Sequence, residues 1–183
     1  MIPLHLKLSG FLSYREPAEV DFTGFHLACI SGTNGAGKSS LLDAVTWALF
    51  GQARKRDDSL VNLGSKAAEV TFTFAYEGSV YRVLRSLPVG KTGSLEFQVA
   101  ENAHPDVSIP LQNITWRPLT EHSIRETQKR IEDTLRLDYE TFINVSFFLQ
   151  GKADQFAQQS PARRKEILGS ILGLEQWEVY RQR

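Results

Sequence analysis

Residues 32–39, GTNGAGKS, combine glycine, lysine and hydroxyl side chains at a spacing that suits phosphate binding. They fit the P-loop pattern G-x-x-x-x-G-K-[ST]. Gly32, Gly35 and Gly37 allow positive φ angles and let the backbone approach a phosphate without a Cβ in the way. Successive N–H groups then form an anion nest, and the N-terminus of a following helix adds partial positive charge. The motif predicts binding of a nucleoside triphosphate.

Two side chains of the motif have further roles in this interpretation. Lys38 carries a point charge that can reach the β and γ phosphates, and the Ser39 hydroxyl can ligate Mg²⁺, which prefers oxygen ligands. The flanks agree with this reading. Residues 26–30 predict a short buried strand, and residues 40–50 predict a helix that ends at Gly51.

The composition limits the classes of protein to consider. The 183 residues are 42% hydrophobic, enough for one sizeable domain with a core. Lys+Arg and Asp+Glu both total 21, so any DNA contact must come from a local patch or from other segments, because no global basic field exists. The single cysteine, Cys29, excludes an internal disulfide framework and predicts a core position. No run approaches ~18 apolar residues, so we expect a cytoplasmic protein without membrane contact.

Alternating apolar residues predict an antiparallel sheet. Residues 4–8 predict a half-buried strand, and residues 20–22 predict a second strand that returns beside it. Alternation continues over residues 69–76, with a turn at Glu77-Gly78, a return over residues 80–85 and a third strand over 95–99. Such a sheet departs from a simple doubly wound P-loop domain, in which strands alternate with helices.

The period changes to a helical one after Glu121. Ile124, Gln128, Ile131 and Leu135 form a narrow helical stripe. A dense apolar run over residues 141–149 then leads to Gln150-Gly151. Ser160-Pro161 predicts another helix start. The buried face of that helix is expected at Ile167, Leu168, Ile171 and Leu172.

Two charged segments have open interpretations. Residues 54–58, RKRDD, lie in a polar surface excursion over residues 52–65 and are either a solvated loop or a contact to nucleotide or a partner. Residues 163–165, RRK, are either a solvated helix face or a contact to phosphate or a partner.

A complete P-loop NTPase also needs an apolar strand that ends in an acidic residue and holds the Mg²⁺ shell. No segment qualifies: residues 18–21 are interrupted by charge, and residues 131–133 fall in a helical pattern. A Ser-Gly-Gly type motif, of the kind that closes an ATP site from a second subunit, is also missing. Either these pieces lie beyond Arg183 or the chain is not catalytic by itself, and the first interpretation is favoured.

Several segments taken together resemble a known family. They are GFLS at residues 10–13, NGAGKSS at 34–40, LLDA at 41–44, FLQG at 148–151, PARRKEIL at 161–168 and ILGLE at 171–175. In this order they resemble the N-terminal half of the head of SMC-like ABC ATPases of double-strand-break repair, the SbcC/Rad50 type. The resemblance implies an α/β fold, the N-terminal lobe of a P-loop ABC-type ATPase head, with an antiparallel β subdomain and helices that lead towards a coiled coil.

The same resemblance implies a division of the chain and a set of partners. Strands, P-loop and first helix would occupy residues 1–65, the β subdomain 66–118, a helical part with the Q-loop 119–173, and the start of the coiled coil 174–183. The implied partners are the protein's own C-terminal ATPase half, a second copy that closes an ATP-dependent head dimer, an SbcD-type nuclease and double-stranded DNA. The full-length protein would hydrolyse ATP, and this chain alone would be inactive.

The resemblance also implies the site residues, with ATP and Mg²⁺ as cofactors. Lys38 and the Q-loop Gln150 would be catalytic, and Ser39 and Gln150 would contact the metal. The nucleotide would be held by Asn34, Gly35, Ala36, Gly37, Lys38, Ser39, Ser40, Val61, Asn62 and Leu63. Relatives often have arginine where this chain has Leu12, so a nucleotide contact from this turn is left open between Leu12 and Arg15.

Two other classes remain as alternatives. The head of a chromosome-structural SMC protein, or of a RecN/RecF-like recombination ATPase, would share the same nucleotide site. A P-loop kinase or GTPase is less favoured, because the chain lacks acidic and lid elements for the first and an Asn-Lys-x-Asp motif for the second.

Overall fold

The structure is a computed structural model that describes residues 1–25, 27–55, 57–102, 113–145 and 160–171. The chain divides into two compact units, Met1–Ile131 and Glu132–Arg183, and each is described by itself. The first unit contains a sheet, the helix α1 and most of α2. The second contains the end of α2 and the helices α3 and α5.

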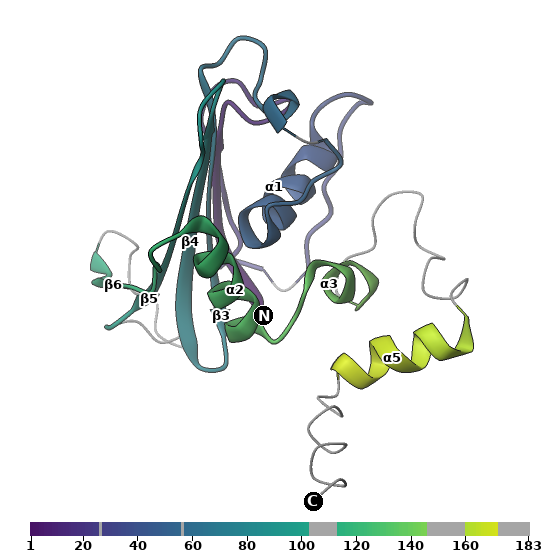
Figure 1. The fold of residues 1–183 in the computed structure, drawn as a ribbon. Helices are drawn as coiled ribbons and strands as arrows, with labels where there is room; N and C mark the ends of the chain where they lie inside the picture. Colours follow the sequence, from purple (N-terminus) through teal and green to yellow (C-terminus); the bar gives the residue numbers. More distant parts are fainter. Residues whose placement is uncertain (26, 56, 103–112, 146–159, 172–183) are drawn as a thin grey trace, which may run out of the picture. The chain divides into compact units, whose positions relative to one another are not determined.

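The first unit is built on one six-stranded sheet, with the strand order β2-β1-β3-β4-β5-β6 (Figure 1). Every neighbouring pair is antiparallel, as the alternating pattern predicts. The strands are β1 (Ile2–Ser9), β2 (Ala18–Asp21), β3 (Ala67–Tyr76), β4 (Ser79–Pro88), β5 (Ser94–Ala100) and β6 (Trp116–Pro118). The three-residue strand β6 was not predicted from the sequence.

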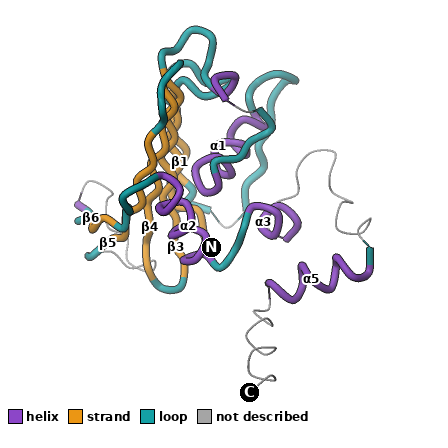
Figure 2. The backbone as a smooth tube through the Cα atoms, in the orientation of Figure 1, coloured by secondary structure: helices purple, strands orange, loops and turns teal. Residues whose placement is uncertain are grey.

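The core lies on one face of this sheet. Leu6, Phe72, Val83 and Phe97 are paired in register across β1, β3, β4 and β5, and all four are buried. Helix α1 (Lys38–Phe50) covers the same face, as Figures 1 and 2 show. Apolar burial of this kind stabilises by about 1.5–3 kcal/mol for each large side chain. The P-loop that precedes α1 is therefore anchored to the core through its helix.

The turn between β3 and β4 confirms the predicted hairpin. Glu77 and Gly78 have φ angles of 46° and 78°, and two positive φ values are typical of the type I′ turns that connect twisted strands. The turn fixes the register from Tyr76↔Ser79 to Ala67↔Pro88. The predicted helix is also confirmed, since α1 ends at Gly51.

The predicted strand before the P-loop is wrong over the residues that the structure describes. Residues 27–30 have no strand conformation, and His26 lies outside the described residues. Leu27 is 93% exposed and Ile30 is 46% exposed. Cys29, predicted to lie in the core, is exposed. An apolar run becomes a buried strand only beside neighbouring strands, and the sheet described here has no strand that pairs with this segment.

Helix α2 (Ile124–Leu135) follows the predicted stripe, with Ile131 and Leu135 buried. Its start is capped by the Ser123 hydroxyl, a contact that the sequence analysis did not use. The Glu126 backbone N–H donates to Ser123 Oγ at 3.1 Å, and that hydroxyl donates to Glu126 Oε2 at 2.9 Å.

The second unit contains α3 (Tyr139–Val145) and α5 (Pro161–Ile171). Helix α5 begins at the predicted Ser160-Pro161 step, with the Arg164 N–H donating to the Ser160 carbonyl at 3.0 Å. The predicted burial of Leu168 is wrong, because this side chain is 47% exposed. A helical stripe is buried only where another element covers it. Leu172 lies outside the described residues.

Candidate phosphate-binding site

The loop at residues 32–37 has the backbone conformation that its glycines predict. Gly32, Gly35 and Gly37 have φ angles of 150°, 85° and 89°, so the predicted positive values are confirmed. Gly37 is the N-cap of α1 and is left-handed, and no side chain caps the helix there. The first N–H groups of a helix have no partner within the helix, so this end of α1 can donate to an anion.

Lys38, the first residue of α1, folds over the loop. Its Nζ donates to the Gly32 carbonyl at 2.7 Å and to the Thr33 carbonyl at 2.8 Å. These two bonds hold the positive charge against the backbone of the loop, whose residues 34–36 are exposed. A lysine ammonium has three donors, so a bound phosphate can accept from it without any movement of the helix.

Gly37 also has a steric role, because the turn at residues 10–15 packs on it. A Cβ at Gly37 would lie 3.0 Å from Tyr14 Cε2 and 3.3 Å from Ser13 Cβ. Burial raises the pKa of the Tyr14 hydroxyl, which keeps it neutral. Contacts between the two turns were missed by the sequence analysis, since nothing in the spacing of residues 14 and 37 signals them.

The residues predicted to contact the nucleotide from a second segment are joined to the same turn. Asn62 Nδ2 donates to the Leu12 carbonyl at 2.7 Å, and the Asn62 N–H donates to the Gly10 carbonyl at 2.8 Å. Val61 is buried, whereas Leu63 is fully exposed. Residues 61–63 therefore lie beside the turn that packs on Gly37, and Leu63 is the member of the three that is open to a ligand.

The two candidates left open in the turn have different environments. Leu12 is left-handed, with φ 49°, an uncommon conformation for a residue with a side chain. The Arg15 side chain lies over Gly64, where an added Cβ would be 3.1 Å from Nε, and pairs with Glu16 at 3.7 Å. Both belong to the turn that adjoins the loop.

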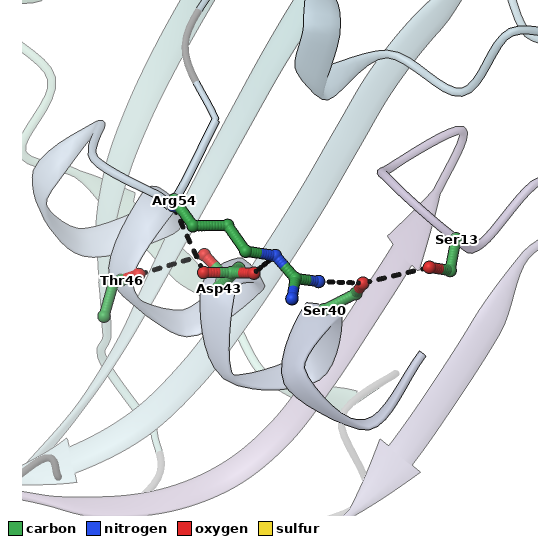
Figure 3. A network of polar contacts seen from close by, with 5 residues as sticks. All are labelled: Ser13, Ser40, Asp43, Thr46 and Arg54. Atoms are coloured by element: carbon green, nitrogen blue, oxygen red, sulfur yellow. Dashed lines mark hydrogen bonds and ion pairs between the residues drawn. The ribbon is translucent and has the colours of Figure 1, made fainter. Parts of the chain in front are cut away.

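A polar network that joins α1 to Arg54 and Ser13 was not predicted (Figure 3). Arg54 Nε lies 2.6 Å from Asp43 Oδ2, and Arg54 Nη2 donates to Ser40 Oγ at 2.9 Å. The Ser40 and Ser13 hydroxyls are 3.2 Å apart. Burial raises the pKa of Asp43 despite the opposing charge of Arg54. Arg54 thus pairs within its own chain while its side chain stays 50% exposed, and the two interpretations of residues 54–58 both stay predictions.

The remaining predicted site residues differ in accessibility. Asn34, Gly35 and Ala36 are exposed, Ser39 is half-buried in the first turn of α1, and Ser40 is fully buried. Gln150, predicted as the Q-loop glutamine, lies outside the described residues. Within the described ranges, no three His, Cys, Asp or Glu side chains are grouped so that they could hold a metal ion. Among the helices of those ranges, none is long and apolar enough to cross a membrane.

Loop, lysine and helix N-terminus together define a P-loop site. A family model described as an AAA domain matches residues 5–179, and the chain belongs to this family. The match spans nearly all of the sequence and includes the loop, α1 and the sheet apart from the first three residues of β1.

Similarity to curated proteins narrows the family assignment. It is 33% identical to the SbcC component of the nuclease SbcCD of Deinococcus radiodurans, over 95% of this chain and 19% of that protein. It is 32% identical to a probable DNA double-strand break repair Rad50 ATPase of Aquifex aeolicus, over 100% of this chain and 18% of that protein. These matches confirm the resemblance to the SbcC/Rad50 type. The chain spans about a fifth of the length of these relatives.

Two solved structures share part of the fold. A chain of the recombination mediator protein RecF with ATP matches with a TM-score of 0.42 and 18% identity, over 56% of this chain and 27% of that chain. The SMC head domain from Thermotoga maritima matches with a TM-score of 0.36 and 25% identity, over 57% of this chain and 38% of that chain. At these TM-scores the two likenesses add nothing to the family assignment.

Proposed function

We propose that this chain is the ATP-binding N-terminal part of an SMC-like DNA-repair ATPase. The observation that carries the proposal is the P-loop itself, with left-handed glycines and Lys38 at the start of a helix. It lies in a chain that matches relatives named as the SbcC component of SbcCD and as a Rad50 ATPase over 95–100% of its length. Those names also favour the repair function over a chromosome-structural SMC or a RecN/RecF-like ATPase.

The residues of the loop fit ATP with Mg²⁺. Residues 34–40 would surround the phosphates, with Lys38 on the β and γ phosphates and the Ser39 hydroxyl on the metal. Residues 61–63 would contact the rest of the nucleotide through Leu63, whose side chain is exposed, whereas the Val61 side chain is buried. Gln150 would contact Mg²⁺ or the attacking water. The metal would neutralise charge on the phosphates during hydrolysis.

The site needs a second protein segment, and the exposed residues before the loop support this step. Leu27 and Ile30 present apolar side chains to solvent next to the P-loop. We propose that the protein's own C-terminal ATPase half packs on residues 27–30, converts them to a buried strand and supplies the acidic strand. A second copy would then close over ATP, and the closed dimer would regulate an SbcD-type nuclease at ends of double-stranded DNA.

Calorimetry tests this function directly. ATP with Mg²⁺ is titrated into the 183-residue chain alone and then into its mixture with the C-terminal half of the same gene product. The proposal expects weak binding and negligible hydrolysis by the chain alone, and tight binding with hydrolysis in the mixture. Turnover by the lone chain at the rate of a complete enzyme would overturn it and favour the kinase class.

A further inference from the structure

The polar network of Figure 3 joins three segments that surround the P-loop. Arg54 belongs to the segment after α1, Ser40 and Asp43 belong to α1, and Ser13 belongs to the turn that packs on Gly37. Ser40 and Asp43 are three residues apart and so share one face of the helix. A single guanidinium spans both, because its Nε reaches the carboxylate while Nη2 reaches the hydroxyl.

The contribution of these contacts to stability depends on how deeply their two acceptors, the Ser40 hydroxyl and the Asp43 carboxylate, are buried. Ser40 is 0% exposed and the Asp43 side chain is 6% exposed, whereas Arg54 is 50% exposed. A buried carboxylate or hydroxyl that loses its partner costs free energy, whereas an exposed arginine is solvated. The Arg54 N–H also donates to Asp43 Oδ1 at 3.3 Å. Arg54 therefore covers Ser40 and Asp43 on α1 and supplies hydrogen-bond donors to both.

The position of Ser40 links this face to phosphate binding. Ser40 follows the metal-ligand candidate Ser39, and its backbone N–H donates to the Gly37 carbonyl at 2.9 Å. Its hydroxyl contacts Arg54 and lies beside the hydroxyl of Ser13. The side chain thus connects the first turn of α1 to both neighbouring segments.

We propose that Arg54 is a positioning residue of the P-loop, which acts through Ser40 and Asp43 to fix the first turn of α1 for the phosphates. The inference rests on the proposed ATP site and deepens it. It assigns the Ser40 hydroxyl a role in this network instead of a direct contact with phosphate. Lysine cannot replace Arg54 fully, because an ammonium can pair with Asp43 but lacks the planar fork that also reaches Ser40.

The test compares ATP affinity with stability in the complete gene product. Arg54→Lys, Ser40→Ala and the double variant are titrated with ATP and Mg²⁺ by calorimetry, and their thermal unfolding midpoints are recorded. The bond that is lost joins two groups of the protein and does not touch ATP, so only part of its free energy affects binding, and we expect binding about five-fold weaker for each single variant. The double variant is expected to bind as weakly as each single one, because both changes remove the same contact. The unfolding midpoint of Ser40→Ala is expected to stay close to that of the wild type, because this variant removes the buried hydroxyl itself and leaves the exposed Arg54 to be solvated. Weaker ATP binding by a variant of unchanged stability separates a positioning role from a merely structural one.

Lys91→Ala is the matched control, since it removes an exposed cation from the turn between β4 and β5 and should leave affinity unchanged. Wild-type affinity in both single variants would overturn the inference, as would losses that multiply in the double variant. If Arg54→Lys fails to fold, Ser40→Ala, which removes a single oxygen atom, decides the outcome alone. A folded wild-type protein that binds no ATP would instead overturn the proposed function.

Discussion

The two ends of α1 are held in opposite ways. At its N-terminus, Gly37 offers no side-chain cap and the loop before it is exposed. At its C-terminus, the Ala48 carbonyl accepts from Arg85 Nε at 3.2 Å and Nη2 at 3.1 Å, and the Leu49 carbonyl accepts from Gln128 Nε2 at 2.9 Å. Both ends of a helix carry unsatisfied backbone groups. Here side chains of the fold cap the C-terminal carbonyls, whereas no side chain caps the N-terminus.

The two ends of α1 also differ in the charged side chains near them. Arg85 places a cation at the negative end of the helix dipole, where it is stabilising. Its guanidinium carbon also lies 5.9 Å from the centre of the Trp47 ring, and its Nη2 donates to Gln128 Oε1 at 2.5 Å. The positive end has no acidic residue in the first turn of α1. An anion is thus left as the natural partner of that end, and we expect changes at the two ends to affect different properties.

Lys38→Ala tests the N-terminal end of α1, called the open end here because no side chain caps it, and should give the largest change in free energy. We expect ATP affinity to fall about 100-fold, because a charge-assisted contact to the phosphates is lost. The free energy of unfolding should change little, since the two bonds of Lys38 are to carbonyls of an exposed loop. Calorimetric titration and urea unfolding measure the two quantities. A loss of stability without a loss of affinity would show that Lys38 is a structural residue.

Arg85→Ala tests the C-terminal end of α1, called the closed end here because Arg85 and Gln128 cap its carbonyls. We expect the free energy of unfolding to fall by about 2 kcal/mol, because hydrogen bonds from a charged group are removed and the Ala48 carbonyl loses its donors. Urea unfolding measures the change. Arg117→Ala is the control, since its side chain is 58% exposed and its ion pair with Glu101 at 3.6 Å should contribute little. Equal losses in the two variants would contradict the contrast between the ends of α1.

Gly51→Ala sharpens the description of the closed end. Gly51 has φ 67° and its N–H donates to the Trp47 carbonyl at 2.8 Å, as in a helix that ends with a left-handed residue. The left-handed conformation costs alanine about 1 kcal/mol, and the new Cβ would lie 3.1 Å from Arg85 Nη1. We expect a loss slightly above 1 kcal/mol in urea unfolding.

Gly90→Ala separates the two causes of that loss. Gly90 has a similar φ of 65°, but nothing lies within 4 Å of an added Cβ. Its loss of stability should report the backbone cost alone. If Gly90→Ala is as destabilising as Gly51→Ala, the contact of Gly51 with Arg85 contributes nothing.

The features at the two ends of α1 also differ in how well the sequence predicts them, because some depend on local patterns and others on contacts between distant residues. The P-loop and the end of α1 at Gly51 depend on local patterns, and both were predicted. Alternation likewise predicted β1 to β5, although it could not find β6, a strand of three residues. The caps by Arg85 and Gln128 join residues 37 and 79 positions apart in the chain. No local period encodes such a pairing.

The error at residues 27–30 has a related cause. The apolar composition of this segment was interpreted correctly as the composition of a buried strand, but burial needs neighbours. The sheet of the first unit offers none to these residues. The network of Arg54 was missed for the reason that applies to Arg85, since its partner Asp43 is 11 residues away across the end of a helix. Gln150 stays a prediction.

The smallest expected effect is a pH dependence near the open end. Burial raises the pKa of Asp43, so the folded state binds more protons than the unfolded state between the two pKa values. This contribution to the free energy of unfolding is present at pH below the unfolded pKa and is lost as pH rises through the folded one. Asp43→Asn lacks this titration. The stability of the wild type relative to Asp43→Asn should therefore be greater at pH ~4 than at pH ~7 in urea unfolding.

Asp21→Asn is a control of opposite sign. Asp21 Oδ1 accepts from the Thr23 hydroxyl at 2.7 Å and from the Thr23 N–H at 2.8 Å, and these bonds lower the pKa of Asp21. Its contribution is present above the unfolded pKa and is lost as pH falls through the folded one. The stability of the wild type relative to Asp21→Asn should therefore increase from acid to neutral pH. If both differences changed in the same direction, burial would not be the dominant influence on Asp43, and its pairing with Arg54 would outweigh desolvation.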